Sequence, residues 1–386
     1  MFAVKYKFII MINRGLYNNI KTKIQQGKKI VVLYGARQVG KTTIARQVID
    51  ELGYKTRYVN ADLLKHHAVL SSRDIKKLSS LTNGYDLLFI DEAQRIDQLG
   101  INLKIIHEEI PNIRVLATGS SSFDLAYKIS DSLSGRKVSY TMYPLSIAEL
   151  ASTMSEYDIR EKLEDLLLYG FYPEVYTTDD INDKLEILEE ITSSYLYKDV
   201  LELSNIRNSV KIHQLLELLA YRIGSEISIN KLSQELSMSR DAVMHYLDLL
   251  EKSFVIFRLQ GYSRNLSKEV KKMDKYYFYD LGIRNMLIED FKPIDKRQDI
   301  GGMWENFIIA ERLKYIRNKG GRNKFYFWRV YTGGEVDLVE TLGKKMWGFE
   351  IKYGKKLAKA PQTWKEVYGH AEYQTINQEN FLDFLM

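Results

Sequence analysis

The sequence predicts an α/β protein built on a parallel sheet, and three stretches carry that prediction. Residues 31–43 read as a buried strand, a loop between two glycines and the start of a helix. Residues 86–94 and 113–122 are apolar strands that end in acids or hydroxyls. Strands buried on both faces of a parallel sheet read as continuous apolar runs, and their carboxyl ends meet at one edge. We therefore expect the polar residues after these strands to converge on one ligand.

The loop after the first strand fits the phosphate-binding pattern G-x-x-x-x-G-K-[ST], the P-loop. Gly35 and Gly40 permit a close backbone approach that a Cβ obstructs. Lys41 is expected to reach the β- and γ-phosphates of ATP and to act in catalysis, and the Thr42 hydroxyl to bind Mg²⁺. The alternative, a glycine turn with a solvated lysine, is disfavoured by the flanking strand and helix. The predicted nucleotide-binding residues are Gly35, Ala36, Arg37, Gln38, Val39, Gly40, Lys41, Thr42 and Thr43.

Composition indicates a globular chain of several domains. It has 386 residues, 45% of them hydrophobic and 27% charged, and one core rarely grows beyond about 250–300 residues. The absence of cysteine excludes disulfides and thiolate sites and suits a reducing cytoplasm, the location we expect. An apolar run at residues 8–12 is too short to span a membrane, so we expect no membrane partner. Residues 1–10 read as an upstream-start extension.

Positive charge is concentrated near the C-terminus. Between Glu311 and Lys359 there are 13 lysines or arginines against five acids, a net +8, whereas the whole chain carries +6 and the remainder therefore −2. A basic module beside a nearly neutral body indicates an anionic polymer as partner, although a solvated basic face gives the same counts.

Two carboxylates end the strand predicted at residues 86–91. Asp91 is expected to hold the Mg²⁺ of Mg-ATP through water, beside Thr42. Glu92 is expected to deprotonate the attacking water, a general-base role typically worth ~10²–10⁴ in rate. The alternative is an acidic pair that caps the next helix, and the P-loop upstream favours the catalytic interpretation.

The next strand and the loop after it supply two further candidates. Ser120 or Thr118 stands where the sensor residue of an AAA+ type ATPase is expected, and a serine there can equally cap the following helix. Arg136 lies on a loop from which an arginine reaches a γ-phosphate, either in its own chain or from a neighbouring subunit of a homo-oligomer. Its alternative is a surface ion pair.

Together these stretches resemble the prokaryotic AAA family ATPases that carry a C-terminal domain of unknown function, DUF4143. The motifs that carry the resemblance are GARQVGKTT at 35–43, LFIDEAQ at 88–94, TGSSS at 118–122, LSGR at 133–136, YPLS at 143–146 and GFYPEV at 170–175. The resemblance spans nearly the whole chain from residue 11. It implies an AAA+-type ATPase core, a helical region, a winged helix and a C-terminal α/β module with a restriction-endonuclease-like, PD-(D/E)xK fold.

The pattern of the middle region agrees with that division. Residues 149–204 show apolar residues at three- and four-residue spacing, typical of a helical lid, and residues 209–262 read as three helices followed by an alternating strand. The domains we expect are a P-loop ATPase core at 11–148, a helical lid or linker at 149–207, a winged helix at 208–265 and a DUF4143 nuclease-like domain at 274–386.

The third predicted helix of the winged region, residues 240–252, is not basic. Its Arg240 and Lys252 are offset by Asp241, Asp248 and Glu251. A helix that reads DNA needs positive charge near the phosphates, so we favour a packing role for it.

A second candidate site lies in the C-terminal module. Strand alternation puts Glu335 with Asp337, and Glu350 with Lys352, on one face each. If these faces meet beside Glu305, the carboxylates Glu305, Asp337 and Glu350 form a Mg²⁺ or Mn²⁺ site of oxygen ligands, with Lys352 as catalytic cation. The pattern matches the nuclease-like family residue by residue. The alternative is two amphipathic strands with solvated charges, because Glu-x-Lys is a common tripeptide.

The leading hypothesis is an ATP-hydrolysing switch or motor coupled to a metal-dependent nuclease-like module that acts on nucleic acid, DNA being favoured over RNA. The alternative is an ATP-dependent regulatory scaffold whose C-terminal module binds DNA or protein without cleavage. A third hypothesis, a transcriptional regulator led by the winged helix, is disfavoured by the near-neutral charge of residues 240–252.

Overall fold

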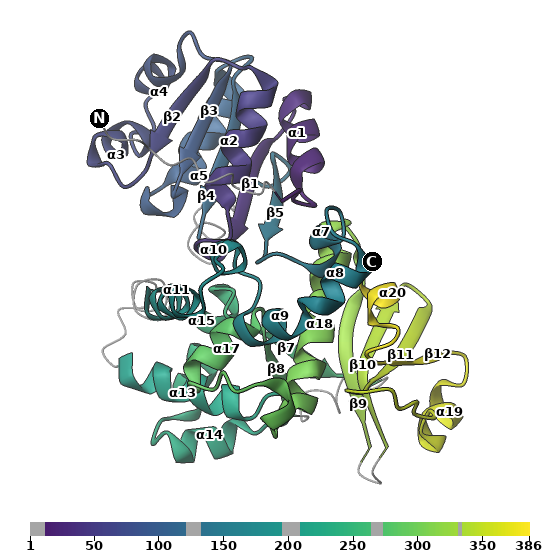
Figure 1. The fold of residues 1–386 in the computed structure, drawn as a ribbon. Coiled ribbons are helices and arrows are strands. Elements are labelled where there is room, and N and C mark those ends of the chain that lie inside the picture. The colour runs from purple at the N-terminus through teal and green to yellow at the C-terminus, as the bar shows by residue number, and fades with distance from the viewer. Residues whose placement is uncertain (1–11, 121–132, 195–208, 264–272, 331–333) are drawn as a thin grey trace.

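The computed structural model describes residues 12–120, 133–194, 209–263, 273–330 and 334–386, and it contains two sheets with helices packed against them (Figure 1). The apolar run at 8–12, except its last residue, lies outside these ranges, as do residues 121–122 of the TGSSS motif and residues 195–207 of the predicted lid. Within the described residues, no helix is both long enough and apolar enough to cross a bilayer.

The N-terminal sheet is entirely parallel, with the strand order β2-β3-β4-β1-β5. Its strands are β1 (Ile30–Gly35), β2 (Thr56–Asn60), β3 (Leu87–Asp91), β4 (Arg114–Gly119) and β5 (Lys137–Met142). The helical segments around it are α1 (Tyr17–Gln26), α2 (Lys41–Leu52), η1 (Leu64–His66), α3 (His67–Leu70), α4 (Ile75–Thr82), η2 (Ala93–Arg95) and α5 (Leu99–Glu109).

Alternation along β1 divides this sheet into two buried faces. Val31 and Leu33 pack in the same core as α1 and α2, whereas Ile30 and Val32 pack in a second core with α4 and α5. Every residue of β1 is buried, as expected of a central strand covered by helices on both sides. The result is a three-layer arrangement, visible as the purple and blue part of Figure 1.

Short helices connect the two sheets. They are α7 (Ile147–Leu150), α8 (Glu156–Glu161), α9 (Leu163–Tyr169), α10 (Pro173–Thr177) and α11 (Ile181–Ser194). Ser146 and Ser155 each form a capping box, with Glu149 and Asp158 respectively, at the starts of α7 and α8. Such a box satisfies backbone N–H groups at both ends of the first helical turn, which fixes where these short helices begin.

The described part of the region predicted as a winged helix, residues 208–265, contains three helices and two strands. They are α13 (Ser209–Tyr221), β6 (Glu226–Ile227), α14 (Ile229–Glu235), α15 (Arg240–Lys252) and β7 (Ile256–Gly261). Strand β8 (Asp274–Phe278), which pairs with β6 and with β7, lies in the predicted DUF4143 domain. Helix α15 has the bounds predicted from the sequence. Ser228 and Ser239 cap α14 and α15. The assignment of this region to the winged-helix class stays a prediction.

The second sheet has the strand order β12-β11-β10-β9-β7-β8-β6. The remaining elements are α17 (Leu281–Leu287), η4 (Ile294–Lys296), α18 (Ile300–Asn318), β9 (Lys324–Arg329), β10 (Glu335–Leu342), β11 (Lys345–Ile351), α19 (Gln362–Tyr368), β12 (Glu372–Ile376) and α20 (Phe381–Leu385). Strands β7 and β9 pair in parallel through Gln260 with Tyr326 and Gly261 with Phe327. Strands from residues 208–265 and 274–386 thus share one sheet, and the domain boundaries stay predictions.

A close crossing of α9 and α17 explains two glycines of the middle region. Gly170, with a φ of +80°, and Gly282 lie against the carboxylate of Asp280 and the carbonyl of Tyr169, where a Cβ would stand 2.1 Å away in each case. The buried Asp280 carboxylate accepts hydrogen bonds from the backbone N–H groups of Phe171, at 2.7 Å, and Ile283, at 3.2 Å. The Asp280 carboxylate thus occupies space that side chains at positions 170 and 282 would need.

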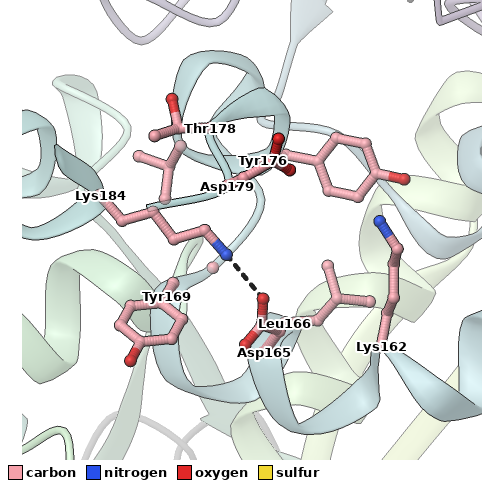
Figure 2. A pocket seen from close by; sticks show the side chains of 10 residues that line it. Lys162, Asp165, Leu166, Tyr169, Tyr176, Thr178, Asp179 and Lys184 are labelled. Atoms are coloured by element: carbon pink, nitrogen blue, oxygen red, sulfur yellow. Dashed lines mark hydrogen bonds and ion pairs between the residues drawn. The ribbon is translucent and has the colours of Figure 1, made fainter. Parts of the chain in front are cut away.

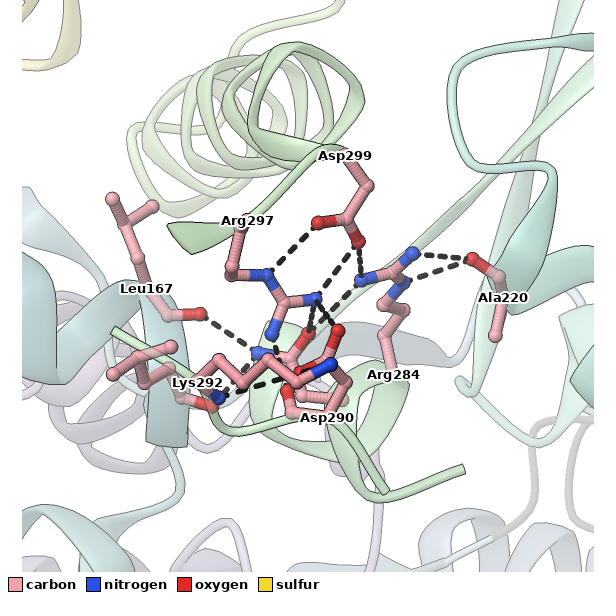
Figure 3. Close-up of polar contacts among 9 residues, drawn as sticks. Leu167, Ala220, Arg284, Asp290, Lys292, Arg297 and Asp299 are labelled. Carbon is pink, nitrogen blue, oxygen red and sulfur yellow. Dashed lines mark hydrogen bonds and ion pairs between the residues drawn. The ribbon is translucent and has the colours of Figure 1, made fainter. Parts of the chain in front are cut away.

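A buried ion-pair network holds α17 to the loop before α18 (Figure 3). The Arg284 guanidinium, 1% exposed, donates twice to the carbonyl of Ala220, at 2.9 and 2.7 Å, and pairs with Asp299. Arg297 donates to the same carboxylate at 2.9 and 2.8 Å. Burial alone would raise the pKa of Asp299, but the two guanidinium groups outweigh burial and lower its pKa to about 2.

Replacing Gly170 by alanine tests the crossing of α9 and α17. We expect Gly170→Ala to destabilise the fold by about 2–4 kcal/mol, because the new Cβ meets the Asp280 carboxylate and the backbone has a positive φ. Gly343→Ala is the matched control, since Gly343 also has a positive φ but has no neighbour within 4 Å, and it should cost about 1 kcal/mol. Urea unfolding of both variants measures the difference, and equal losses would contradict the clash.

Glu251, at the end of α15, predicts a pH dependence of stability. Burial raises the pKa of Glu251 to about 7, with Asp248 and Asp274 adding to the rise and Arg258 opposing it. The folded protein therefore keeps a proton that the unfolded chain loses, so this group lowers stability as the pH rises from about 4.5 to about 7.

Glu251→Gln removes that titration. We expect its stability relative to the wild type to increase by on the order of 1 kcal/mol between pH 4.5 and pH 8, a modest value because the Glu251 side chain is 31% exposed. Urea unfolding at several pH values measures this gain. A difference that stays constant with pH would show that Glu251 does not titrate in this range.

Candidate nucleotide site and a second charged site

The P-loop lies between β1 and α2, and its two glycines are fixed by geometry. At Gly35, with a φ of +147°, a Cβ would stand 2.1 Å from the carbonyl oxygen of Met142 on the neighbouring strand. Gly40 caps α2 with a φ of +93°. The loop therefore turns directly from the end of a buried strand into the N-terminus of a helix, where backbone N–H groups attract anions.

Lys41 brings a buried positive charge into this loop. Its side chain is folded over the loop, and the ammonium donates to the carbonyl oxygens of Gly35 at 2.9 Å and Ala36 at 2.5 Å. The residue is only 5% exposed. The ammonium and the helix N-terminus thus act on the same small volume, and both favour a phosphate group there.

Two hydroxyls converge on Asp91 at the end of β3. Thr42 Oγ1 donates to the Asp91 carboxylate, 3.1 Å from one oxygen and 3.0 Å from the other, and Thr118 on β4 donates to it as well. The parallel register brings these strand ends together, because Asp91 lies one strand from Thr118 and beside the start of α2. A hydroxyl and a carboxylate at this distance fit the oxygen ligands of Mg²⁺.

Glu92 and Ser120 are joined by Gln94, a residue to which the sequence prediction gave no role. Gln94 Nε2 donates to Glu92 Oε2 at 2.5 Å and to Ser120 Oγ at 2.9 Å. Glu92 has a left-handed backbone, with a φ of +55°, which is costly for a residue with a side chain and is common at functional sites. The two sensor candidates therefore differ in their contacts, Thr118 with Asp91 and Ser120 with Gln94.

Arg136 lies at the opposite edge of the sheet. It precedes β5, whose Lys137 aligns with Ile30 at the start of β1, whereas the P-loop follows the end of β1. One strand length, about 17 Å, therefore separates it from the P-loop of its own chain. Its guanidinium contacts Glu108, with Nε donating at 2.6 Å. Within its own chain Arg136 thus forms the surface ion pair given as the alternative, and its contact with a nucleotide, from a neighbouring subunit, stays a prediction.

The second sheet brings the predicted C-terminal residues together. The Lys352 ammonium lies 2.6 Å from Glu350 Oε1 and 3.9 Å from Asp337 Oδ2, and the N–H of Ile351 donates to Asp337 at 2.8 Å. Glu305 joins them from α18, since its charge and that of Glu350 act on Asp337. One helix and two adjacent strands thus form a single charged cluster, as the alternation of residues predicts.

Lys275 on β8 is the member of this cluster that the sequence prediction missed. Its ammonium lies 3.0 Å from Glu305 Oε1 and 2.8 Å from Glu335 Oε1, and Tyr277 donates to the same Glu305 oxygen at 2.5 Å. Burial lowers the pKa of Lys275, but the carboxylates of Glu305 and Glu335 outweigh burial and raise it. The sequence signal that could have identified Lys275 was a lysine within a strand of aromatic residues.

Asp337 shows that the cluster is short of positive charge. Burial, followed by the charges of Glu305 and Glu350, raises the pKa of Asp337 to about 7, although the Ile351 N–H and Lys275 lower it. The carboxylate is therefore partly protonated near neutral pH, where an isolated aspartate is ionised.

The fit of a metal ion to this cluster is poor as the side chains lie. Among the residues that the structure describes, no three acidic or histidine side chains are arranged to hold a metal ion. Lys275 lies between Glu305 and Glu335 and already compensates them. We derive no step through a metal here, and the second Mg²⁺ or Mn²⁺ site stays a prediction.

A small polar cavity lies elsewhere, among α9, α10 and α11 (Figure 2). Its volume is about 100 Å³, and Lys184 donates across it to Asp165 at 2.6 Å. Tyr169 lies under the Lys184 ammonium and Tyr176 under that of Lys162. These charges are compensated within the cavity wall, so it shows no chemistry of its own.

The parallel sheet, the P-loop between β1 and α2, and the acidic end of β3 define a P-loop ATPase fold. Residues 27–151 match a family model described as AAA domain, and residues 300–379 match one described as domain of unknown function DUF4143. Residues 160–293 match a third, domain of unknown function DUF8612. The chain therefore contains an AAA domain of the P-loop ATPases followed by a DUF4143 domain, as the motif resemblance predicted.

Relatives share most of this layout. An uncharacterized protein of Mycobacterium tuberculosis is 27% identical over 326 residues, which cover 84% of this chain and 70% of the relative. An uncharacterized protein of Methanocaldococcus jannaschii is 28% identical over 333 residues, covering 81% and 72%. The Walker-type ATPase of Pyrococcus abyssi, a solved structure, is similar with a TM-score of 0.50 at 16% identity, covering 72% of this chain and 96% of that one. This likeness supports the fold.

Proposed function

We propose that the protein is an ATP-hydrolysing switch or motor whose nucleotide state acts on a basic, metal-dependent nuclease-like C-terminal module that acts on nucleic acid. The observation that carries the first half is the meeting of Thr42 and Asp91 at 3.0 Å beside the buried ammonium of Lys41. Glu92 follows Asp91 directly, at the same strand end. This set supplies phosphate binding, metal binding and a general base in one place.

The proposed hydrolysis assigns each group a task. The P-loop N–H groups and Lys41 bind the phosphates, and Thr42 with Asp91 holds Mg²⁺, which when bound neutralises charge on the β- and γ-phosphates. Glu92 accepts a proton from the attacking water, whose oxygen forms the new bond to the γ-phosphorus as the bond to ADP breaks. Gln94 orients the Glu92 carboxylate through its 2.5 Å hydrogen bond, and Ser120 holds Gln94 from the other side.

Arg136 enters this proposal from a second subunit. Its position at the far edge of the sheet supports a contact with the nucleotide of a neighbouring copy in a homo-oligomer. Within one chain it forms an ion pair with Glu108, so the contact in the oligomer has to replace that pair.

The nucleic-acid half of the proposal rests on charge. Beyond β11 the chain runs past Lys352 to Lys355, Lys356 and Lys359, whose side chains are exposed. Lys355 lies 3.2 Å from Glu379. Exposed lysines next to each other attract phosphate backbones with little sequence preference. We favour DNA over RNA as the polymer and a reducing cytoplasm as its place, since the sequence has no cysteine.

The winged-helix region supports a packing role in this proposal. On α15, Lys252 pairs with Asp248 at 2.5 Å and Glu251 lies 3.9 Å from Arg258 of β7. Positive charge there is compensated locally, so α15 offers little attraction to phosphates.

The second candidate function is a regulatory scaffold whose C-terminal module binds DNA or protein without cleavage. The observation that favours it is the Lys275 ammonium between Glu305 and Glu335, because it compensates Glu305, one of the three carboxylates predicted to hold a catalytic metal. The two functions share the ATPase and differ in what the charged cluster does.

Two variants of the candidate nucleotide site test the ATPase. Lys41→Ala should lose Mg-ATP binding, because the buried ammonium is removed, whereas Glu92→Gln should bind ATP and hydrolyse it at least ~100-fold more slowly. Isothermal titration and phosphate release measure the two properties separately. Unchanged turnover in Glu92→Gln would remove Glu92 from its role as base.

Asp337→Ala tests the C-terminal module. Purified protein is incubated with DNA or RNA and Mg²⁺ or Mn²⁺, with and without ATP. A nuclease-like module requires cleavage that Asp337→Ala lowers at least ~100-fold. Glu372→Ala, which changes an exposed acid on the adjacent strand β12, should cleave as the wild type does. Absence of cleavage in all three proteins, with salt-sensitive binding intact, would support the scaffold, and equal cleavage by all three would assign the activity to a contaminant.

A further inference from the structure

Arg14, which precedes the residues matched to the AAA domain, hydrogen-bonds both to the P-loop and to the segment that follows β5. One guanidinium nitrogen donates to the carbonyl of Val39, within the P-loop, at 2.7 Å. A second donates to the carbonyl of Tyr143 at 2.6 Å, and Nε donates to Glu149 at 3.0 Å. The side chain is 10% exposed, so these bonds form away from bulk water, where charge-assisted hydrogen bonds are strong.

The bond to Val39 sets the direction of the next N–H group. A trans peptide is planar, so its C=O and the following N–H point in opposite directions. By holding the Val39 carbonyl on its own side, Arg14 turns the Gly40 N–H the other way, into the part of the loop where phosphate oxygens bind. Gly40 has a positive φ and no Cβ, so its own backbone restricts this peptide weakly.

Glu149 fixes Arg14 in turn. Its buried carboxylate, 4% exposed, accepts the Arg14 Nε–H, the Gly15 N–H at 2.8 Å, and the Ser146 N–H and hydroxyl at 3.0 Å each. Four donors on one carboxylate leave it a single orientation. Glu149 therefore fixes the Nε side of the guanidinium, while its two terminal nitrogens donate to the carbonyls of Val39 and Tyr143.

The segment from Tyr143 to Glu149, here called the strap, is also held from the DUF4143 side. Glu311 of α18 accepts the Ile147 N–H at 2.7 Å. Lys314, one turn further along α18, donates to the Leu145 carbonyl at 3.0 Å and to Glu311 at 2.6 Å. The strap thus lies between Arg14, which holds the P-loop, and a charge pair of the C-terminal domain.

We propose that Arg14 is a positioning residue of the nucleotide site, which aims the Val39–Gly40 peptide at the phosphates and is kept in place by the strap and α18. The proposal rests on the proposed binding of ATP. Since binding free energies are reciprocal, a strap docked on α18 strengthens nucleotide binding, and a bound nucleotide strengthens that docking.

The first test compares Mg-ATP affinities by isothermal titration. Arg14→Gln should bind Mg-ATP at least tenfold more weakly than the wild type, and Arg14→Lys, which keeps the charge but only one hydrogen-bonding group, should fall between them. Lys21→Gln is the matched control, because Lys21 on α1 pairs with Glu51 on α2 without touching the P-loop, and it should bind as the wild type does. Arg14→Gln binding as tightly as Lys21→Gln overturns the proposal.

Melting temperatures measured without nucleotide show whether each variant is folded. A loss of affinity can then be distinguished from unfolding. If Arg14→Gln does not fold, Arg14→Lys carries the test, and wild-type affinity in that variant overturns the proposal. A wild-type protein that fails to bind Mg-ATP refutes the proposed function itself, which is a different result from equal binding by wild type and variants.

The second test addresses the strap. Lys314→Met removes the ammonium that holds the Leu145 carbonyl and should weaken Mg-ATP binding at least threefold, from a helix that does not contact the P-loop. Lys319→Met, beyond the end of α18 and bonded to Tyr315, should leave the affinity unchanged. Equal affinities in these two variants would remove the strap and α18 from the proposal.

Discussion

The position of the two sheets relative to each other depends on a buried charge pair, Glu311 with Lys314 on α18. Their side chains are 2% and 1% exposed. Burial raises the pKa of Glu311, while Lys314 and the Ile147 N–H oppose the rise. Breaking a buried pair typically costs about 3–5 kcal/mol, because the remaining charge has no partner. Glu311 and Lys314 also form hydrogen bonds with the strap, through the Ile147 N–H and the Leu145 carbonyl. The strap must therefore keep one position on α18 for both charges to stay fully hydrogen-bonded.

Helix α18 carries this pair and Glu305, one member of the charged cluster, on a single element. Glu305 lies six residues before Glu311, about 9 Å along the helix axis, and it is bonded to Lys275 and Tyr277. A displacement of the strap that shifts α18 therefore changes the distance between Glu305 and the strands that hold Asp337. No other element among the described residues contributes polar side chains both to the strap and to this cluster. Helix α18 is therefore the element that links the strap to the charged cluster in the proposed coupling between the nucleotide and the C-terminal module.

Local patterns predicted much of the structure, and distant contacts account for what the sequence could not provide. The P-loop, Asp91 at a strand end and the bounds of α15 follow from spacing and strand polarity. Arg14 and Glu149 meet across 135 residues, and no periodicity encodes such a pair. The pairing of β7 with β9, which joins two predicted modules in one sheet, is likewise set by tertiary packing.

The charge balance of the cluster determines which charged ligands it can bind. Four carboxylates, those of Glu305, Glu335, Asp337 and Glu350, face two ammonium groups, of which Lys275 is 3% and Lys352 is 42% exposed. The proton that Asp337 holds up to about pH 7 partly makes up the difference. A cation would compete with that proton and with Lys275 for these carboxylates, while the exposed side chains of Lys352 and Arg329 and the lysines beyond β11 attract phosphate groups. Because Lys275 is buried and paired with both Glu305 and Glu335, a metal ion would have to displace it before the cluster could act as the proposed nuclease-like module.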